Sequence, residues 1–348
     1  LRFKGNFMSK NKNKNKNSIV FVIPYFGKFP NYFQFWLDSC RFNSSIDWVI
    51  FTDDHSDFDI PNNVHFNYIS FSDIKKKFNE KLGFEVALDN PYKLTDFKPS
   101  YGYIFHEFIG NYDFWGFCDV DLIFGDIRKF ITDDILNSND KILANGHFQL
   151  LRNTIRCNEL FMKALNGDVI YKDVYTDSNH RGFDEYGTKA FHSICEKSNE
   201  KIYINNLLFA DINSWFKHFS LTFVRQLLLS SELAEVEHIK ENNNSSSIFS
   251  FDRGNLYRLH LDCNGILNSS EYMYVHFQKR KMTVDNRLIL NSNNGSFFMV
   301  PNKFILTIKD VSCDDIKRLV KKNIFSRRRL KRQVYITIRM WVKNNLGV

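Results

Sequence analysis

Two aspartates stand two residues apart in the otherwise apolar segment YDFWGFCDVDLIFGDIRKF, which covers residues 112–130. Alternate residues of a strand point to the same face, so Asp119 and Asp121 are predicted to project together from a buried strand. Two neighbouring negative charges are costly to desolvate unless a positive charge lies between them. Mn²⁺ and Mg²⁺ are hard cations that accept oxygen ligands. The pattern, followed by a predicted turn at Gly125, therefore predicts a divalent metal site.

The segment VHFQKR, residues 275–280, is the second candidate for this site. It places His276 at the end of a predicted strand, three residues before Lys279 and just ahead of Arg280. An imidazole nitrogen is a tolerated ligand for Mn²⁺, so His276 is predicted as a third metal ligand. The two cations would then lie against a diphosphate group on the metal. The alternative is a basic strand end on the protein surface.

Strands and helices are predicted to alternate through the first 130 residues. The predicted strands cover residues 19–26, 48–51 and 64–69, and the predicted helices cover residues 31–40, 71–82 and 100–109. This alternation is typical of an α/β fold with a mostly parallel, Rossmann-like central sheet flanked by helices. Ligands of such sheets bind at the carboxyl ends of the strands, where Tyr25, Asp53 and Asp54 are expected beside the aspartate pair. These positions together predict a nucleotide site.

Three of these polar residues have plain structural alternatives. Asp53 and Asp54 can hydrogen-bond a uridine or a ribose, or they can cap the turn after their strand. Lys98 precedes a predicted helix in the segment KPSY and can bind a phosphate or a carboxylate near the strand ends. A single lysine more often lies solvated on the surface. The sequence leaves both alternatives open.

Two further pairs are candidates for binding a sugar. Gly146 and His147 lie in a strand predicted over residues 142–151, where glycine permits close backbone approach and histidine can hydrogen-bond hydroxyls. Asp184 and Glu185 are predicted to open a helix that runs to about residue 198. They can bind donor-sugar hydroxyls or act as general base. The alternatives are a core histidine and acids that favour a helix start.

Composition limits the class of protein. A chain of 348 residues can form one large domain with an appendage, and its six scattered cysteines favour free thiols in a reducing cytosol. No apolar run approaches the roughly 20 residues that span a bilayer. SIVFVIPYF after the basic leader lacks a small-residue cleavage site and reads as a first strand rather than a signal peptide.

Positive charge gathers at the two ends of the chain. Residues 1–17 hold six Lys or Arg and residues 317–343 hold eleven, with no acid in either stretch, so the remainder is acidic. This distribution favours a charged surface partner at the ends over a nucleic-acid groove through the domain. Apolar positions 330, 334, 338, 341 and 342 recur at helical spacing. They predict an amphipathic helix on an anionic membrane; the alternative is a helix packed on its own domain.

The chain resembles a family of bacterial glycosyltransferase-like proteins from capsule and O-antigen gene clusters. The resemblance covers roughly residues 19–282 and is most specific in YDFWGFCDVDLIFGD. Its other pieces are IPYFG, TDD, DFKPSYGYIF, GHFQLLRN, FDE and VHFQKRKM. It implies a GT-A fold, in which a Rossmann-like nucleotide domain is joined to an acceptor-binding half. Asp119 and Asp121 match the Asp-x-Asp motif of such enzymes. His276 takes the place of the metal-ligand histidine of related retaining galactosyl- and glucosyltransferases, with HFQK where they have His-x-x-Gly-x-x-Lys-Pro.

The sequence and the resemblance together predict a metal-dependent hexosyltransferase of surface-polysaccharide assembly, at the inner face of the cell membrane. Its donor would be a nucleotide sugar, taken as UDP-linked, and its acceptor a saccharide or a lipid-linked saccharide. One alternative is a metal-dependent nucleotidyltransferase, which would need a glycine-rich phosphate loop after the first strand. The other is a non-catalytic, basic-tailed binding protein with a sugar-nucleotide fold.

The predicted domain organisation has three parts. Residues 1–17 form a disordered basic leader, residues 18–310 the GT-A domain, and residues 311–348 a basic amphipathic C-terminal segment. Within the domain, the nucleotide half is expected over about 18–130 and the acceptor half over about 131–310.

Overall fold

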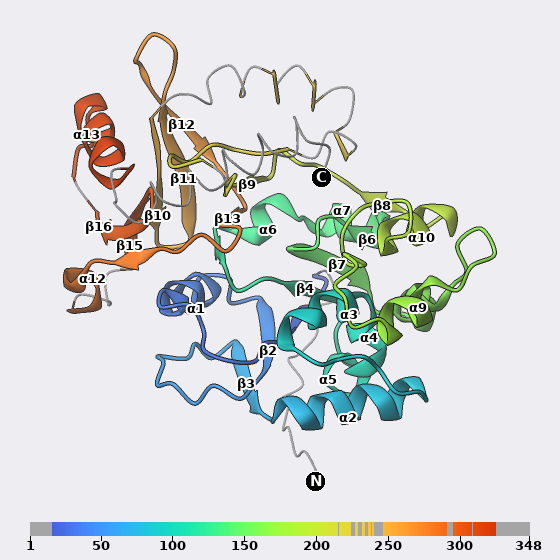
Figure 1. The fold of residues 1–348 in the computed structure, drawn as a ribbon. Helices are drawn as coiled ribbons and strands as arrows, with labels where there is room; N and C mark the ends of the chain where they lie inside the picture. The colour runs from blue at the N-terminus through green and yellow to red at the C-terminus, as the bar shows by residue number, and fades with distance from the viewer. Residues whose placement is uncertain are drawn as a thin grey trace, which may run out of the picture. The chain divides into compact units, whose positions relative to one another are not determined.

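The computed structural model describes residues 16–324, except for 215, 224–226, 229–231, 234–235, 238, 240–245, 291–294 and 308. The described chain forms two compact units that interleave along the sequence (Figure 1). Unit 1 comprises residues 16–29, Asn43–Asp119 and Ile131–Ile204, and unit 2 comprises Pro30–Phe42, Val120–Phe130 and residues 205–324. The sequence predicts two consecutive halves instead. The assignment of donor and acceptor halves stays a prediction.

Unit 1 is an α/β unit built on a mixed seven-stranded sheet. In spatial order its strands are β3 (Val64–Tyr68), β2 (Ile46–Thr52), β1 (Ile19–Pro24), β4 (Phe114–Cys118), β7 (Phe148–Arg152), β6 (Lys141–Ile142) and β8 (Ile202–Tyr203). Strand β7 runs antiparallel to both of its neighbours, whereas every other neighbouring pair is parallel. Strands β1 and β2 are buried throughout, which explains their continuous apolar sequences.

Helices cover one face of this sheet and bury an aromatic core beneath them. The helical segments of unit 1 are α2 (Phe71–Leu82), η1 (Pro91–Lys93), α3 (Leu94–Phe97), η2 (Lys98–Ser100), α4 (Tyr101–Ile104), α5 (His106–Ile109), α7 (Asp133–Ser138), α8 (Ile155–Asn158), η3 (Leu160–Met162), α9 (Ile170–Thr176) and α10 (Phe191–Lys197). Phe51 of β2 stacks on Phe105 with ring centroids 4.5 Å apart, and Phe78 of α2 packs edge-on against Phe97. Ser70 caps α2 by accepting a hydrogen bond from the Asp73 amide, and Gly83 ends it.

Three predicted elements of unit 1 differ from the structure. The single helix expected over 100–109 is two short helices, α4 and α5, separated at Phe105. The strand expected over 142–151 is interrupted, so that Gly146 and His147 lie in the loop between β6 and β7. Asp184 and Glu185 lie in turns, and the helix that they were expected to open, α10, begins only at Phe191.

Unit 2 contains a small three-stranded sheet. Its central strand is β13 (Tyr274–His276), which runs antiparallel to β5 (Leu122–Phe124) and parallel to β9 (Phe209–Asp211). The register pairs His276 with Leu122 on one side and with Asp211 on the other. The start of β5 and the ends of β13 and β9 therefore meet at one edge of this sheet. Helices α1 (Phe33–Arg41) and α6 (Ile127–Phe130) belong to the same unit.

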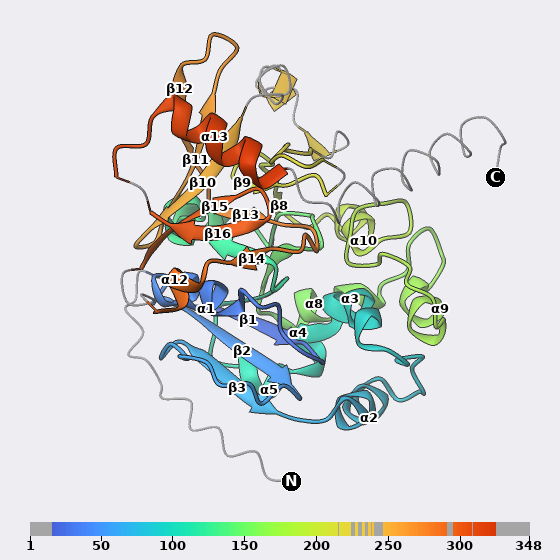
Figure 2. The same cartoon turned by 60° about the vertical axis from the view of Figure 1, so that its left-hand side comes forward.

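The rest of unit 2 is a six-stranded, mainly antiparallel sheet. Its strand order is β12 (Leu267–Glu271), β11 (Asn255–Leu261), β10 (Ser247–Asp252), β15 (Ser296–Val300), β16 (Lys303–Leu306) and β14 (Thr283–Val284), and α12 (Asn286–Leu290) precedes β15. Helix α13 (Cys313–Ile324) lies along one face of this sheet (Figure 2) and buries Ile316 and Val320 against Ile248 and Val300. The first part of the predicted C-terminal appendage is thus packed onto unit 2.

Two predictions about the chain ends fall mostly outside the described residues. The basic leader lies outside them up to residue 15, and so does the amphipathic helix expected from residue 330 onward. Among the described residues, no helix is both long enough and apolar enough to cross a bilayer.

Candidate functional site

The predicted aspartate pair lies in a loop rather than on a strand. Strand β4 ends at Cys118 and β5 begins at Leu122, so Asp119, Val120 and Asp121 connect the two. The rule that alternate residues share one face of a strand therefore does not apply here, and that expectation is wrong. Asp119 belongs to unit 1 and Asp121 to unit 2.

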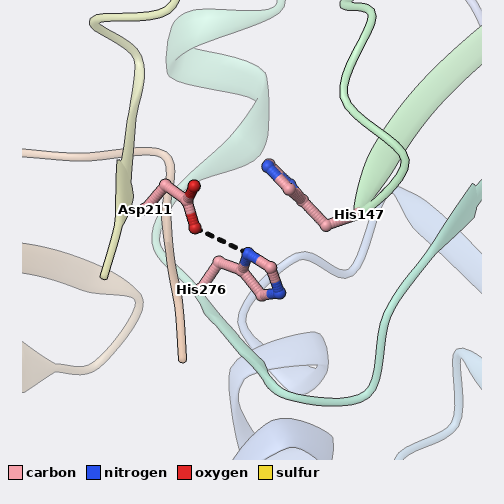
Figure 3. Close-up of side chains that lie close together, drawn as sticks. All are labelled: His147, Asp211 and His276. Carbon is pink, nitrogen blue, oxygen red and sulfur yellow. Dashed lines mark hydrogen bonds and ion pairs between the residues drawn. The ribbon is translucent and has the colours of Figure 1, made fainter. Parts of the chain in front are cut away.

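In unit 2, an imidazole is held between two carboxylates, which we call the imidazole clasp. His276 Nδ1 donates a hydrogen bond to Asp211 Oδ1 at 2.8 Å (Figure 3). The other ring nitrogen, His276 Nε2, lies 3.4 Å from Asp121 Oδ1. All three residues are buried, and they come from the strand termini that meet at one edge of the three-stranded sheet. The prediction that His276 ends a strand is confirmed.

The clasp is a charged unit. Burial by itself would lower the pKa of His276, but the carboxylates of Asp121 and Asp211 raise that pKa well above its ordinary value of 6.5. Burial would likewise raise the pKa of Asp121, yet the charge of His276 and the amide of Lys279 lower it. The clasp therefore holds an imidazolium beside the ionised carboxylate of Asp121, with Asp211 bonded to its other ring nitrogen.

The turn after His276 completes the clasp through its backbone. Gln278 and Lys279 both have positive φ angles, 48° and 59°, which are unusual for residues other than glycine. This conformation directs the Lys279 amide to Asp121 Oδ2 at 2.6 Å, while Gln278 Nε2 donates to both carboxylate oxygens of Asp211 at 2.8 Å. The Lys279 side chain is exposed. The turn therefore fixes both carboxylates of the clasp.

Arg280 has a structural role that the sequence did not predict. Its buried guanidinium donates to the backbone carbonyls of Asn213, Lys217 and His218 at 3.0–3.3 Å and lies over the ring of Phe219. These bonds hold the loop that follows β9. The prediction that Arg280 lies against a diphosphate stays a prediction, and the Lys279 side chain is exposed at the same turn.

The clasp fits a divalent metal in the chemistry of its donors. Metal-ligating histidines usually donate their second ring N–H to a carboxylate, as His276 does to Asp211. The other nitrogen of His276 and Asp121 Oδ1 converge to 3.4 Å and would supply one nitrogen and one oxygen ligand. A divalent metal there would displace a proton from His276, so two positive charges would replace one between the carboxylates.

In unit 1, a buried lysine joins two carboxylates, and we call Lys98, Asp119 and Asp184 the lysine cluster. Lys98 Nζ lies 2.7 Å from Asp119 Oδ1 and 3.0 Å from Asp184 Oδ2, and it also donates to the Gly146 carbonyl at 2.8 Å. The side chain is 8 % exposed, so the alternative of a solvated surface lysine is wrong. Lys98 instead contacts three of the residues that the sequence predicted for the site: Asp119, Asp184 and Gly146.

Two acidic side chains approach the backbone of Gly146 closely. Its amide donates to Glu185 Oε2 at 3.1 Å. A Cβ atom added there would lie 2.7 Å from Asp184 Oδ2 and 2.8 Å from Glu185 Oε1. The adjacent residue, His147, is buried and accepts the Asp119 amide through its carbonyl at 3.1 Å. Gly146 lies in a loop, and its predicted part in binding a sugar stays a prediction.

The electrostatics of the lysine cluster depend on the balance between burial and charge. Burial would lower the pKa of Lys98, but Asp119 and Asp184 raise it well above its ordinary value, so the ammonium stays charged. Burial raises the pKa of Asp184 to about 6, and Lys98 only partly offsets this rise while Glu185 adds to it. Asp184 therefore titrates near neutral pH, where a general acid or base is useful.

The predicted nucleotide residues after β1 and β2 divide into two roles. Asp54 is buried and accepts hydrogen bonds from Lys28 Nζ at 2.6 Å and from the Phe29 amide at 3.0 Å, so it organises the loop as a turn-capping residue would. Burial would raise the pKa of Asp54, but these partners hold it well below its usual range. Asp53 is exposed and accepts the Gly27 amide at 2.7 Å, and Tyr25 stacks on Phe29.

Sequence reasoning missed Asp211 and Gln278. Asp211 stands alone in the segment FAD, 65 residues before His276, and only the pairing of β9 with β13 brings them together. Gln278 lies inside the quoted HFQK segment, but its contact with Asp211 depends on the left-handed turn. An aspartate at a strand end was the one available signal.

The comparisons with known proteins establish a family. The model described as "Family of unknown function (DUF6625)" matches residues 21–307. The chain belongs to this family. Among proteins with curated descriptions, none matches the chain.

Solved structures of glycosyltransferases are similar to parts of the chain. The galactosyltransferase LgtC in complex with donor and acceptor sugar analogs is 13 % identical, with a TM-score of 0.32 over 57 % of this chain and 77 % of LgtC. GlyE of Streptococcus pneumoniae TIGR4 is 17 % identical, with a TM-score of 0.29 over 56 % of this chain and 46 % of GlyE. Mouse xyloside xylosyltransferase 1 is 8 % identical, with a TM-score of 0.32 over 58 % of this chain and 89 % of that chain. At these TM-scores the similarity decides neither fold nor activity.

Proposed function

We propose that this protein is a metal-dependent glycosyltransferase. It would move a hexose from a nucleotide sugar, taken as UDP-linked, to a growing cell-surface polysaccharide or a lipid-linked acceptor. The observation that carries the proposal is the imidazole clasp, in which His276 lies between Asp121 and Asp211. Asp121 is the second acid of the Asp-x-Asp pattern, so a predicted oxygen ligand and the predicted nitrogen ligand do converge.

Mn²⁺ or Mg²⁺ would be held by Asp121 and His276, with Asp211 orienting the imidazole. Asp119 stands two residues before Asp121, so covalent geometry keeps their Cα atoms within about 7 Å, and we propose Asp119 as the third ligand. The metal would neutralise charge on the departing nucleoside diphosphate. The exposed Lys279 would add a cation to the same phosphates.

The lysine cluster is proposed to hold the donor sugar. Asp184 and Glu185 present carboxylate oxygens beside Lys98, and such oxygens accept hydrogen bonds from sugar hydroxyls. A pKa of about 6 would also let Asp184 serve as base to an acceptor hydroxyl. His147 keeps its predicted role as a hydroxyl-binding residue. At the ends of β1 and β2, Tyr25 and the exposed Asp53 are proposed for the uridine, with Asp54 supporting their loop.

Turnover of nucleotide sugars tests the proposal. The purified protein would be incubated with a panel of UDP-, GDP- and dTDP-sugars with and without Mn²⁺, and release of nucleoside diphosphate measured. We expect metal-dependent release from at least one donor, lost in Asp121→Ala and in His276→Ala. Asp314→Ala, at a side chain that is 94 % exposed, is the matched control and should match the wild type.

The alternatives give different products in the same experiment. A nucleotidyltransferase would release pyrophosphate from nucleoside triphosphates in the presence of sugar phosphates. A non-catalytic binding protein would bind a nucleotide sugar without consuming it. Either result, obtained without metal-dependent diphosphate release, would contradict the proposed activity.

A membrane surface is proposed as a partner through residues 317–343, of which residues 325–343 lie outside the described part of the chain. Each Lys or Arg near an anionic bilayer contributes on the order of 1 kcal/mol. The full chain should float with anionic vesicles and dissociate at high salt, whereas a chain ending at residue 324, which retains α13, should not float. Equal flotation of the two chains would remove this partner and the proposed location at the inner face of the membrane.

A further inference from the structure

The hairpin of β11 and β12 has two chemically different faces. On one face, Leu261 packs beside Ile316 and Val320 of α13, with Leu259 and Leu267 against the same core. The opposite face carries Arg258 and His260, because side chains alternate along a strand. The register places Ser270 opposite Arg258 and Asn268 opposite His260, so the polar side chains of both strands share that face.

The polar face of the hairpin lies next to an apolar part of the same side of the sheet. Arg258 pairs across the sheet with Phe249, and Phe249 belongs to the core that also contains Leu256 and Met299. Polar side chains thus replace apolar ones toward the outer edge of the same sheet face. A sheet face next to a core is normally apolar, so a change to an arginine that is 3 % exposed needs an explanation other than packing.

A cavity of about 470 Å³ lies against this face, and we call it the hairpin cavity. Its polar wall includes Arg258, His260, Asn268, Ser270, Glu271 and Tyr272. Leu207 and Phe223 give it an apolar wall. Cavities of this size with a few convergent polar groups and an apolar side are typical of small-molecule sites.

The charges of the wall balance one another, which favours a neutral ligand. The guanidinium of Arg258 hydrogen-bonds Tyr272, and Asp262 brings a carboxylate to the same wall. Glu271 brings a second carboxylate, which forms an ion pair with Lys129 outside the cavity. The other polar groups of the wall are amide, hydroxyl, imidazole and phenol groups, which can donate and accept hydrogen bonds. Such groups match the hydroxyls of a sugar, and an apolar wall matches its C–H face.

We propose that the hairpin cavity binds a neutral saccharide and serves as a subsite for the acceptor. Calling the ligand an acceptor rests on the proposed glycosyltransferase function; saccharide binding itself does not. Tyr272 lies four residues before His276, so their Cα atoms are at most about 14 Å apart. A bound oligosaccharide can extend over that distance toward the imidazole clasp. The cavity thus holds the acceptor chain away from the reacting end.

A printed array of neutral, sialylated and phosphorylated saccharides tests the site, followed by calorimetry on any saccharide that binds. Neutral saccharides should bind the wild-type protein. Asn268→Phe, which places a ring in the cavity, should weaken binding at least about tenfold. Asn255→Phe is the matched control: Asn255 is an exposed asparagine on the partner strand that does not line the cavity, and its affinity should equal that of the wild type. Tyr272→Phe, which removes one hydroxyl, should give a smaller loss.

Metal-dependent UDP affinity, measured on the same preparations, separates the two proposals. Asn268→Phe should leave it unchanged, which also shows that the variant is folded. Saccharide binding without any effect of Mn²⁺ on UDP affinity would overturn the proposed function and keep the cavity proposal. Binding only to anionic members of the array, no binding at all, or equal loss in both asparagine variants would overturn the cavity proposal.

Discussion

The lysine cluster of unit 1 and the imidazole clasp of unit 2 solve the same problem with different cations. Each places two carboxylates around one buried positive charge. In the lysine cluster the charge is the ammonium of Lys98, whose pKa is raised well above its ordinary value, so it stays in place. In the clasp the charge is a proton on His276, and a metal can replace it. The contrast supports our proposal that the clasp is the site where a metal exchanges with a proton, whereas the lysine cluster keeps its own cation.

The largest effect is expected from breaking the fixed site. Lys98→Met leaves the carboxylates of Asp119 and Asp184 without their counter-charge, which should lower the free energy of unfolding by about 3 kcal/mol. Denaturant unfolding measures the loss. Lys76→Met removes a lysine from an exposed pair with Glu80 and should change the free energy of unfolding by less than about 0.5 kcal/mol. Equal stability of the two variants would mean that Lys98 is not the electrostatic centre of unit 1.

The second effect concerns the support of the exchangeable site. Asp211→Asn keeps a hydrogen-bond acceptor for His276 Nδ1 but removes the charge, and it should weaken Mn²⁺ binding roughly 10- to 100-fold. Calorimetry of Mn²⁺ binding in the presence of UDP measures the change. Asp314→Asn serves as the exposed control. Wild-type metal affinity in Asp211→Asn would reduce Asp211 to a packing residue.

The third effect is the pH dependence of Mn²⁺ binding at the imidazole clasp. Because the pKa of His276 is raised above 6.5, protons compete with the metal over a wider pH range than an unperturbed histidine would allow. Mn²⁺ affinity should therefore fall by about tenfold for each pH unit below that pKa. Titrations at several pH values measure the slope. A flat profile down to pH 5 would show that no histidine ligates the metal.

A further effect of the lysine cluster should appear in the pH dependence of turnover, through Asp184. Burial raises its pKa to about 6, so the ionised form is disfavoured in the folded protein and predominates only above that pH. If the carboxylate binds the sugar or acts as base, turnover should fall as pH drops through about 6. Asp184→Asn should lose most of the turnover and also the fall of turnover at low pH. Asp173→Asn, at an exposed acid in α9, should keep both. If turnover of Asp184→Asn still falls as pH drops through about 6, another group causes that fall.

Much of the framework could be predicted from local patterns. Strand β1 is a continuous apolar run that was predicted as a first strand, and α2 was predicted with its observed bounds, 71–82; in the structure Ser70 caps its start and Gly83 ends it. The local sequence pattern also placed His276 at the end of a strand, as observed. These features depend on residues close together in the sequence, which periodicity and capping rules describe.

The remaining features depend on long-range contacts. Lys98 looks like a surface lysine in isolation, and only the approach of residues 119, 146 and 184 explains its burial. Asp184 and Glu185 resemble a helix start, yet their carboxylates are drawn to the backbone of Gly146 and the segment forms turns. Asp211 meets His276 through pairing between strands far apart in the sequence. No local pattern records these approaches.

The central claim is that the imidazole clasp holds a metal that the donor diphosphate needs. Calorimetric titration of UDP into protein stripped with EDTA, with and without Mn²⁺, tests it most directly. We predict that Mn²⁺ raises UDP affinity at least about tenfold in the wild type and not at all in Asp121→Ala. Equal UDP affinity with and without Mn²⁺ in the wild-type protein would contradict the claim.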